Sequence, residues 1–319
     1  MMFDAAVLLG FGLAVAFAAP ACAGRVIPAD SPRLGLAFWL ASLFSTAAAF
    51  LLAMAMLALG DFPVRDMLVD AVRSCLSVLH HYISISPLAV AAIVAGGTCL
   101  IWLSWIAART LHGQKEAAMR HSAMLSATGV LDRRLGATIV DHPTVNAYSV
   151  PGARATIVIT TGALRDLRPA EVDAVLAHER AHLAGHHHVI RGVAVFFVSA
   201  FPFLPVTRSS SRAIAHYLER LADEAASRAT DRRTLAGALV AAGSSSAPLA
   251  TLGVGGGDVL ERVHRLLAPH RSRPWRRIAG GLLVATLFVV PFAVTATGLT
   301  GLVWTDHCLF TTSASTQTS

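Results

Sequence analysis

The stretch Pro169-Ala-Glu-Val-Asp-Ala-Val-Leu-Ala-His-Glu-Arg-Ala-His-Leu-Ala-Gly185 decides how the middle of the chain folds. Proline suits the first turn of a helix, and Glu171 behind it is favourable to the helix dipole. Apolar residues then recur at helical spacing up to about Gly185. The stretch therefore predicts one helix, on which His178 and His182 lie on the same face because they are four residues apart.

The same helix carries the pattern His-Glu-x-x-His at 178–182. Two imidazoles one turn apart are close enough to bind one zinc ion. Glu179 adjoins their face, where its carboxylate can act as a general base on a water molecule. A pattern with three fixed positions also arises by chance, so the alternative is that these are two surface histidines without a metal. Other features of the sequence are needed to distinguish the two interpretations.

A catalytic zinc site needs three protein ligands and one open position. His188 would complete the longer pattern His-Glu-x-x-His-x-x-Gly-x-x-His through Gly185, which is typical of metzincins. Those enzymes also require a methionine turn after the zinc helix, whereas all seven methionines of this chain precede His178. The metzincin interpretation therefore fails, and His186–His188 are interpreted as a polar helix end.

The other candidate ligand is Glu219, which lies 37 residues after His182 on a helix expected from Ser211 to about Thr230. Asp223 follows one turn later on the same face, where it could orient a ligand histidine. A Glu/Asp pair of this kind is by itself usually a solvated helix face. Beside the first motif, the metal-site interpretation is favoured, with one zinc ion per chain.

Composition and charge indicate a membrane protein. Apolar residues make up 55% and charged residues 14% of the 319 residues, whereas soluble domains average about 45–50% and about 25%. A helix needs about 20 mostly apolar residues to cross the hydrocarbon core. The net charge of +7 comes from scattered arginines without a nucleic-acid-reading motif, so no nucleic-acid partner is expected. Four segments are long enough to span: Phe3–Ala23, Leu34–Leu59, Leu88–Ala108 and Ile278–Trp304.

The first apolar segment has an alternative, because Ala21-Cys22-Ala23 resembles the cleavage site of a secretory signal. No Lys or Arg precedes the apolar run, and Asp4 does, which favours a retained helix. Basic residues near the other spans predict the orientation. Arg109 and Lys115 follow the third span directly, whereas no basic residue follows the fourth. We therefore expect 109–277 in the cytoplasm and both chain ends outside.

The region between the third and fourth spans reads as a mixed α+β domain. β-branched runs at Ala137–Val140 and Ala155–Thr160 have turn residues around them, which is typical of strands. A short amphipathic helix is expected at Val259–Leu267, after a loop at Gly243–Gly257. The predicted fold class is thus α+β: a multi-span helical membrane protein whose polar domain carries a small β-sheet.

The apolar segment Ile190–Val206 separates the histidine pair from Glu219. If it crossed the bilayer once, Glu219 and His178 would lie on opposite sides and could not bind one metal. At 17 residues, with Pro202 and Pro205, it is too short for a two-helix hairpin. We therefore expect a re-entrant, membrane-associated segment at 190–206, or an internal helix that covers the site.

These motifs resemble those of the membrane gluzincin peptidases, which include HtpX-like and CAAX-prenyl-protease-type enzymes and BlaR/MecR-type antirepressor proteases. Those families share His-Glu-x-x-His followed by a helix with Glu-x-x-Ala-Asp, as Glu219–Asp223 reads. They also share a segment similar to Asn146–Gly152 and then a strand like Thr156–Thr160. The resemblance spans roughly 137–230.

The resemblance implies roles for individual residues. His178, His182 and Glu219 would be the zinc ligands and Glu179 the catalytic base. The strand that would pair with an extended substrate consists of Ala155, Thr156, Ile157, Val158, Ile159 and Thr160. Apart from the resemblance, His216 and Tyr148 are candidates for stabilising the transition-state oxygen, although a structural role is favoured for each.

Three spans before the domain, and the sequence Arg-Val-His-Arg-Leu-Leu at 262–267, favour the BlaR/MecR-type branch, with the HtpX-like and CAAX-prenyl-protease-type branch next. The chain continues for only 15 residues after the fourth span and shows no penicillin-binding domain there, so direct β-lactam sensing is not expected.

The expected function is a membrane-bound zinc endopeptidase that cleaves a protein or peptide substrate at the cytoplasmic face of the cell membrane. Its role would be repressor cleavage or quality control of membrane proteins. The alternative is a non-catalytic zinc-binding membrane protein that regulates a partner. No signal for an oligomeric state is present. The expected division is three spans with an outer loop (1–108), a cytoplasmic zinc peptidase domain (109–277), a fourth span (278–304) and an outer tail (305–319).

Overall fold

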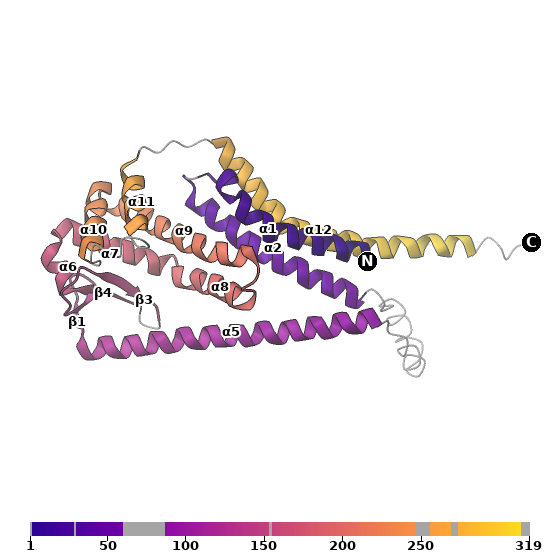
Figure 1. The fold of residues 1–319 in the computed structure, drawn as a ribbon, viewed down its shortest axis with the longest axis horizontal. Coiled ribbons are helices and arrows are strands. Elements are labelled where there is room, and N and C mark those ends of the chain that lie inside the picture. The colour runs from indigo at the N-terminus through magenta and orange to yellow at the C-terminus, as the bar shows by residue number, and fades with distance from the viewer. Residues whose placement is uncertain are drawn as a thin grey trace, which may run out of the picture.

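Long apolar helices and a polar region with a small sheet make up the structure (Figure 1). This computed structural model describes residues 2–28, 30–59, 87–152, 155–245, 256–268 and 274–313. The predicted loop between the second and third spans lies outside these residues. The order of elements confirms the α+β class, with helices before and after a four-stranded sheet.

Among the described residues, four helices are long and apolar enough to cross a membrane, as predicted. All four extend beyond the predicted apolar segments, and α5 and α12 do so by the most. The helix α5 continues without a break past the apolar part and leads to the first strand (Figure 1). The four helices are α1 (Met2–Val26), α2 (Pro32–Leu59), α5 (Pro87–Thr128) and α12 (Pro274–Ser313).

The sheet has the strand order β1-β2-β4-β3. Its strands are β1 (Val130–Asp132), β2 (Ala137–Val140), β3 (Ala147–Val150) and β4 (Thr156–Thr160). The strand β4 is parallel to β2 and antiparallel to β3. Of these strands, the sequence predicted β2 and β4, whose runs of β-branched residues are buried or half-buried.

The position of β4 corrects the prediction that Ala155–Thr160 would pair with a substrate. Thr156–Ile159 pairs with β3, and Val158–Thr160 pairs with β2 on the other side. Where β4 pairs on both sides, it has no backbone groups left to bind a peptide. The strands at the two edges of the sheet are β1 and β3.

The predicted helix with the two histidines is α7, which runs from Pro169 to Ala184 and follows the short helix α6 (Thr161–Asp166). At its start, the Glu171 carboxylate accepts hydrogen bonds from the backbone N–H of Arg168, at 2.9 Å, and from the Arg168 guanidinium, at 2.6 Å. Its last turn ends at Gly185, whose N–H donates to the carbonyl of Ala181.

The apolar segment between the two motifs forms one half of a helical hairpin. The helix α8 (His187–Ala200) ends at Phe201, and α9 (Pro205–Ala229) returns beside it (Figure 1). The segment 190–206 by itself holds only one full helix, and the returning helix is made almost entirely of the polar sequence that follows it. It also begins at Pro205 rather than Ser211, since proline suits a first helical turn.

Two further helices complete the polar region. The helix α10 (Arg232–Ser245) extends into the start of the predicted loop at Gly243–Gly257, and α11 (Gly256–Leu267) begins at its end. Residues 246–255 lie outside the described part. The expected amphipathic helix at Val259–Leu267 is confirmed and is one turn longer at its start.

The hairpin of α8 and α9 packs among the apolar helices. One buried cluster joins residues of α1 and α2, such as Phe38 and Leu43, with Phe197 of α8 and Ile214 of α9. The α2 backbone also approaches α9 closely. A Cβ atom at Gly35 would lie 2.2 Å from the Tyr217 ring, so only glycine fits there. The polar domain and the apolar helices therefore share a core.

Candidate metal centre

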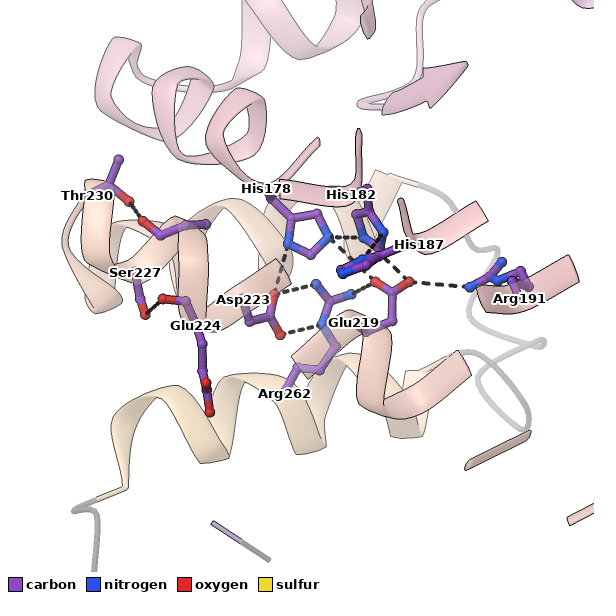
Figure 2. Close-up of polar contacts among 11 residues, drawn as sticks. His178, His182, His187, Arg191, Glu219, Asp223, Glu224, Ser227, Thr230 and Arg262 are labelled. Atoms are coloured by element: carbon purple, nitrogen blue, oxygen red, sulfur yellow. Dashed lines mark hydrogen bonds and ion pairs between the residues drawn. The ribbon is translucent and has the colours of Figure 1, made fainter. Parts of the chain in front are cut away.

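The two motifs predicted to bind zinc meet between α7 and α9 (Figure 2). His178 and His182 come from α7 and Glu219 from α9, and one ligand atom from each lies within 4.8 Å of the other two. The two Nε2 atoms are 3.1 Å apart. The Glu219 carboxylate lies 3.5 Å from Nε2 of His178 and 3.7 Å from Nε2 of His182. The hairpin brings these groups together because it returns the chain to the side from which it came.

The other nitrogen of the His178 ring contacts Asp223, as the sequence predicted. Nδ1 of His178 lies 3.1 Å from the Asp223 carboxylate, which is almost fully buried. Arg262 of α11 donates two hydrogen bonds to the same carboxylate, at 2.7 and 2.9 Å. Its guanidinium also lies 3.4 Å from Glu219. Arg262 thus holds the carboxylate that contacts His178.

The other nitrogen of the His182 ring contacts His187, which corrects the interpretation of His186–His188 as a polar helix end. The Nδ1 atoms of His182 and His187 are 2.9 Å apart, and His187 is buried. A Cβ atom at Gly185 would lie 2.5 Å from the His187 ring. Glycine at this position therefore makes room for the imidazole. No spacing rule singled out His187, because its role depends on the turn between α7 and α8.

The carboxylates favour positive charge at this site. Burial alone would lower the pKa of His178, but its contacts with Asp223 and Glu219 outweigh that effect and raise the pKa to about 9. Burial would likewise raise the pKa of Glu219, yet contacts with both histidines keep it far below its ordinary value. A buried cluster that holds its carboxylates ionised and attracts a cation is suited to a divalent metal.

The surroundings of Glu179 indicate a role different from that of the candidate ligands. Its side chain is buried, and burial raises its pKa above the ordinary value for a carboxyl group, although the neighbouring histidines and Ser149 act in the opposite direction. A raised pKa is what a carboxylate needs in order to take up a proton during a reaction and release it again.

A cleft of about 290 Å³ opens onto the three candidate ligands. Tyr148 and Ser149 of the edge strand β3 line it, together with Glu179 and Arg191. A larger groove of about 1010 Å³ runs between α5 and α8 and shares Tyr148, Ser149 and Arg191 with the cleft. The candidate ligands are therefore reached along β3 and from the side of α5.

The two residues predicted to stabilise a transition-state oxygen have different positions. Tyr148 lines the cleft, as expected. His216 does not line it: its Nε2 atom lies 3.5 Å from Glu261 and 3.4 Å from the Arg265 guanidinium, both on α11. These contacts favour the structural alternative for His216, because this residue, although one turn before Glu219, turns toward α11.

The donor atoms fit zinc. Two imidazole nitrogens and one carboxylate oxygen form the ligand set of many catalytic zinc sites, which leave a further position for water or substrate. In the part of the chain that the structure describes, no cysteine lies near the site, since Cys22 and Cys99 belong to α1 and α5. A structural zinc site would instead have four protein ligands and favour cysteine.

Comparisons with known proteins agree with this geometry. Residues 112–276, which are about half of the chain, match Peptidase family M48. A curated relative, a "Protease HtpX homolog" of Moorella thermoacetica (strain ATCC 39073 / JCM 9320), is 32% identical over 103 residues. That match covers 29% of this chain and 33% of the relative, so the chain spans about a third of the length of the relative. No solved structure matches.

The matched region contains both motifs and α11 with Arg262, and it runs from the end of the third candidate span to the start of the fourth. The relative's name fits the HtpX-like branch, and the preference for the BlaR/MecR-type branch is not confirmed. Because the family match covers half of the chain and includes the cluster of His178, His182 and Glu219, this chain belongs to Peptidase family M48.

Proposed function

We propose that this protein is a membrane-bound zinc endopeptidase in which His178, His182 and Glu219 bind the metal and Glu179 is the catalytic base. The observation that carries the proposal is the convergence of the three ligand atoms within 4.8 Å, with Glu179 in the same cleft. Asp223 and His187 would each hold one ligand histidine in position through its second ring nitrogen.

A zinc ion in this site would polarise the scissile carbonyl and make water a stronger nucleophile near neutral pH. Glu179 accepts the proton of the attacking water and later donates it to the leaving amine. Tyr148, which lines the same cleft, is the remaining candidate for a hydrogen bond to the oxygen that becomes negative.

The edge strand β3 is the proposed binding strand for the substrate backbone. It contributes Tyr148, Ser149 and Val150 to the walls of the groove and ends at Val150, just before Pro151. An extended peptide beside β3 would add a strand to the sheet, so that backbone hydrogen bonds bind substrates of many sequences. An endopeptidase with a wide range of substrates needs binding of this kind.

The position of the groove between α5 and α8 favours a membrane protein as the substrate. At one end it shares Arg191 with the cleft of the candidate ligands, and at the other it is lined by Trp102 and Trp105. Both tryptophans belong to the candidate span Val90–Arg120. A polypeptide that leaves the bilayer along this groove would reach the metal centre. Repressor cleavage, the role of the BlaR/MecR-type branch, stays the second prediction.

We further propose that 109–277 lie in the cytoplasm. Arginine and lysine follow the apolar part of α5, and Arg276 and Arg277 lie in the first turn of α12, at the end of the span nearer the polar domain. Basic residues at span ends are typical of the cytoplasmic side. Labelling cysteines introduced at Arg133 and Arg134 in intact and permeabilised cells would test this orientation.

The decisive experiment compares Glu179→Gln with the wild type in detergent. The variant should bind zinc as the wild type does, measured by elemental analysis, while cleavage of unfolded casein falls by about 10²–10⁴-fold, as expected for loss of a general base. Glu116→Gln on the exposed face of α5 is the matched control and should leave both properties unchanged.

Two results would count against the proposal. Proteolysis that survives in Glu179→Gln would show that another group is the base. A wild-type protein that binds zinc but cleaves no substrate, including membrane proteins supplied in vesicles, would favour the non-catalytic zinc-binding protein instead.

A further inference from the structure

A second cleft, of about 610 Å³, lies where the polar domain meets the apolar helices. It is lined by the connection from α1 to α2, by the end of α9 and start of α10, and by the start of α12. Three of the four candidate spans therefore begin or end at this cleft. We call it the arginine cleft, and its charged residues are Asp30, Arg33, Glu224, Arg228, Arg232 and Arg277.

The arginine cleft is cationic. Four guanidinium groups and two carboxylates line it, which leaves a formal excess of two positive charges. Asp30 is already paired, because its carboxylate lies 3.0 Å from the Arg277 guanidinium. Within the described part of the chain, neither Arg33 nor Arg228 has an ion pair or a side-chain hydrogen bond. Two arginines thus face a concave surface without an acidic partner.

The helices around the cleft are fixed relative to one another. Arg276 of α12 donates a hydrogen bond to the backbone carbonyl of Arg25, at the end of α1, over 2.8 Å. The pair of Arg277 and Asp30 joins α12 to the connection between α1 and α2. The guanidinium groups of the arginine cleft therefore come from helices whose relative positions are fixed. Arginines spread over one solvated helix face would not be positioned in this way.

We propose that the arginine cleft binds the phosphate group of an anionic phospholipid. Guanidinium groups bind phosphate oxygens through paired, charge-assisted hydrogen bonds. Basic pockets between membrane helices, at the level of the headgroups, are suited to acidic lipids. Because three spans border the cleft, the acyl chains of a lipid bound there can extend along α2 and α12 into the hydrocarbon core. A soluble anion would gain nothing from those apolar surfaces.

The test uses the full chain, purified in dodecyl maltoside and depleted of lipid. Thermal unfolding is followed while dioleoylphosphatidylglycerol is added, and in parallel with dioleoylphosphatidylcholine or inorganic phosphate. Phosphatidylglycerol should raise the unfolding temperature at low concentration, and the other two additives should not. For Arg33→Gln/Arg228→Gln, the concentration that gives half of the shift should rise by roughly 10- to 30-fold, since each arginine near a lipid surface contributes about 1 kcal/mol.

The matched control is Arg133→Gln/Arg134→Gln, which removes the same charge from the exposed turn between β1 and β2. It should respond to phosphatidylglycerol as the wild type does. If the cleft variant is poorly stable, counting retained lipids on Arg228→Gln alone by native mass spectrometry gives the same comparison.

Equal responses of the cleft variant and the wild type would overturn the proposal, as would equal responses to phosphatidylcholine and phosphatidylglycerol. A shift produced by inorganic phosphate alone would show a site for a soluble anion and overturn the lipid assignment. None of these measurements needs peptidase activity, so they stand apart from the proposed catalytic function.

Discussion

Nδ1 of His187 lies 2.9 Å from Nδ1 of His182, so the second ring nitrogen of this candidate ligand has a buried imidazole as its partner. The corresponding partner of His178 is a carboxylate, Asp223, at 3.1 Å. The two ligand rings are therefore held in unlike ways. A carboxylate strengthens the donor power of a ring and stabilises its charge, whereas a neutral imidazole mainly fixes its orientation.

The first prediction concerns Gly185, which makes room for the His187 ring. In Gly185→Ala, the new Cβ atom would meet that ring at 2.5 Å and displace it. The backbone itself should tolerate alanine, because φ at Gly185 is −81°. Zinc affinity measured by competition with a chelator should fall by about 10- to 100-fold, the usual cost of losing a partner of a ligand.

His187→Ala should cause a similar loss, and the two changes together should cost little more than either one, since both act through the same ring. Gly243→Ala in α10 is the control, because a Cβ atom there makes only ordinary contact with Val259. Additive losses in the double variant would contradict the proposed mechanism.

The second prediction concerns the partner of His178. Asp223→Asn keeps the size of the side chain but removes its negative charge. The His178 ring then loses the carboxylate that stabilises positive charge on it. Zinc affinity should fall by about 10- to 100-fold. Peptidase activity at saturating zinc should fall less than in Glu179→Gln, because the base is intact. An unchanged zinc affinity would show that Asp223 does not support the ligand.

The third prediction concerns the ion pair of Arg262 with Asp223, whose side chains are only 11% and 5% exposed. Arg262→Gln removes the guanidinium from the buried carboxylate and leaves His178 as its remaining charged neighbour. The loss should therefore lie below the roughly 3–5 kcal/mol that is typical of a buried charge left without any partner. Thermal unfolding of the metal-free protein should show this loss. Arg265→Gln, on the same helix, removes a more exposed pair with Glu261 and should have a much smaller effect.

The fourth prediction concerns pH and the start of α7. The hydrogen bond from Arg168 lowers the pKa of Glu171 below its model-compound value, although burial acts in the opposite direction. A lowered pKa in the folded state adds stability above the unfolded pKa of 4.5, and that stability is lost as pH falls through the folded value. The unfolding temperature of Glu171→Gln should therefore lie below that of the wild type at pH 7.

This difference between Glu171→Gln and the wild type should close as the pH is lowered beneath about 4.5. Asp173→Asn, an exposed carboxylate on the same helix, serves as the control and should show little change at either pH. A difference that stays constant with pH would indicate that the carboxylate contributes through shape rather than through its charge.

Pairs of site residues that lie on the same helix could be predicted from the sequence. The spacing of His178 and His182, and of Glu219 and Asp223, places each pair on one face of a helix whatever the rest of the chain does. Length and composition likewise identified the four apolar helices, because the thickness of the hydrocarbon core sets a simple requirement.

Features that depend on how elements meet could not be predicted in the same way. The strand β4 has the stronger β-branched run, but strand order places β3 at an edge and β4 inside the sheet, and strand order is not encoded in a local pattern. His187 becomes a partner of His182 only through the turn at Gly185 and His186. Arg262 reaches Asp223 from 39 residues away, and no spacing rule connects them.

The contact of Gly35 with the Tyr217 ring has a practical meaning for work with this enzyme. Tyr217 lies two residues before Glu219, so the backbone of the candidate span α2 supports the helix that carries the third candidate ligand. A truncated protein without α1 and α2 would lose this support of α9, and Phe197 and Ile214 would be exposed to water. We therefore expect the candidate metal centre itself, and not only the apolar helices, to need detergent or a bilayer.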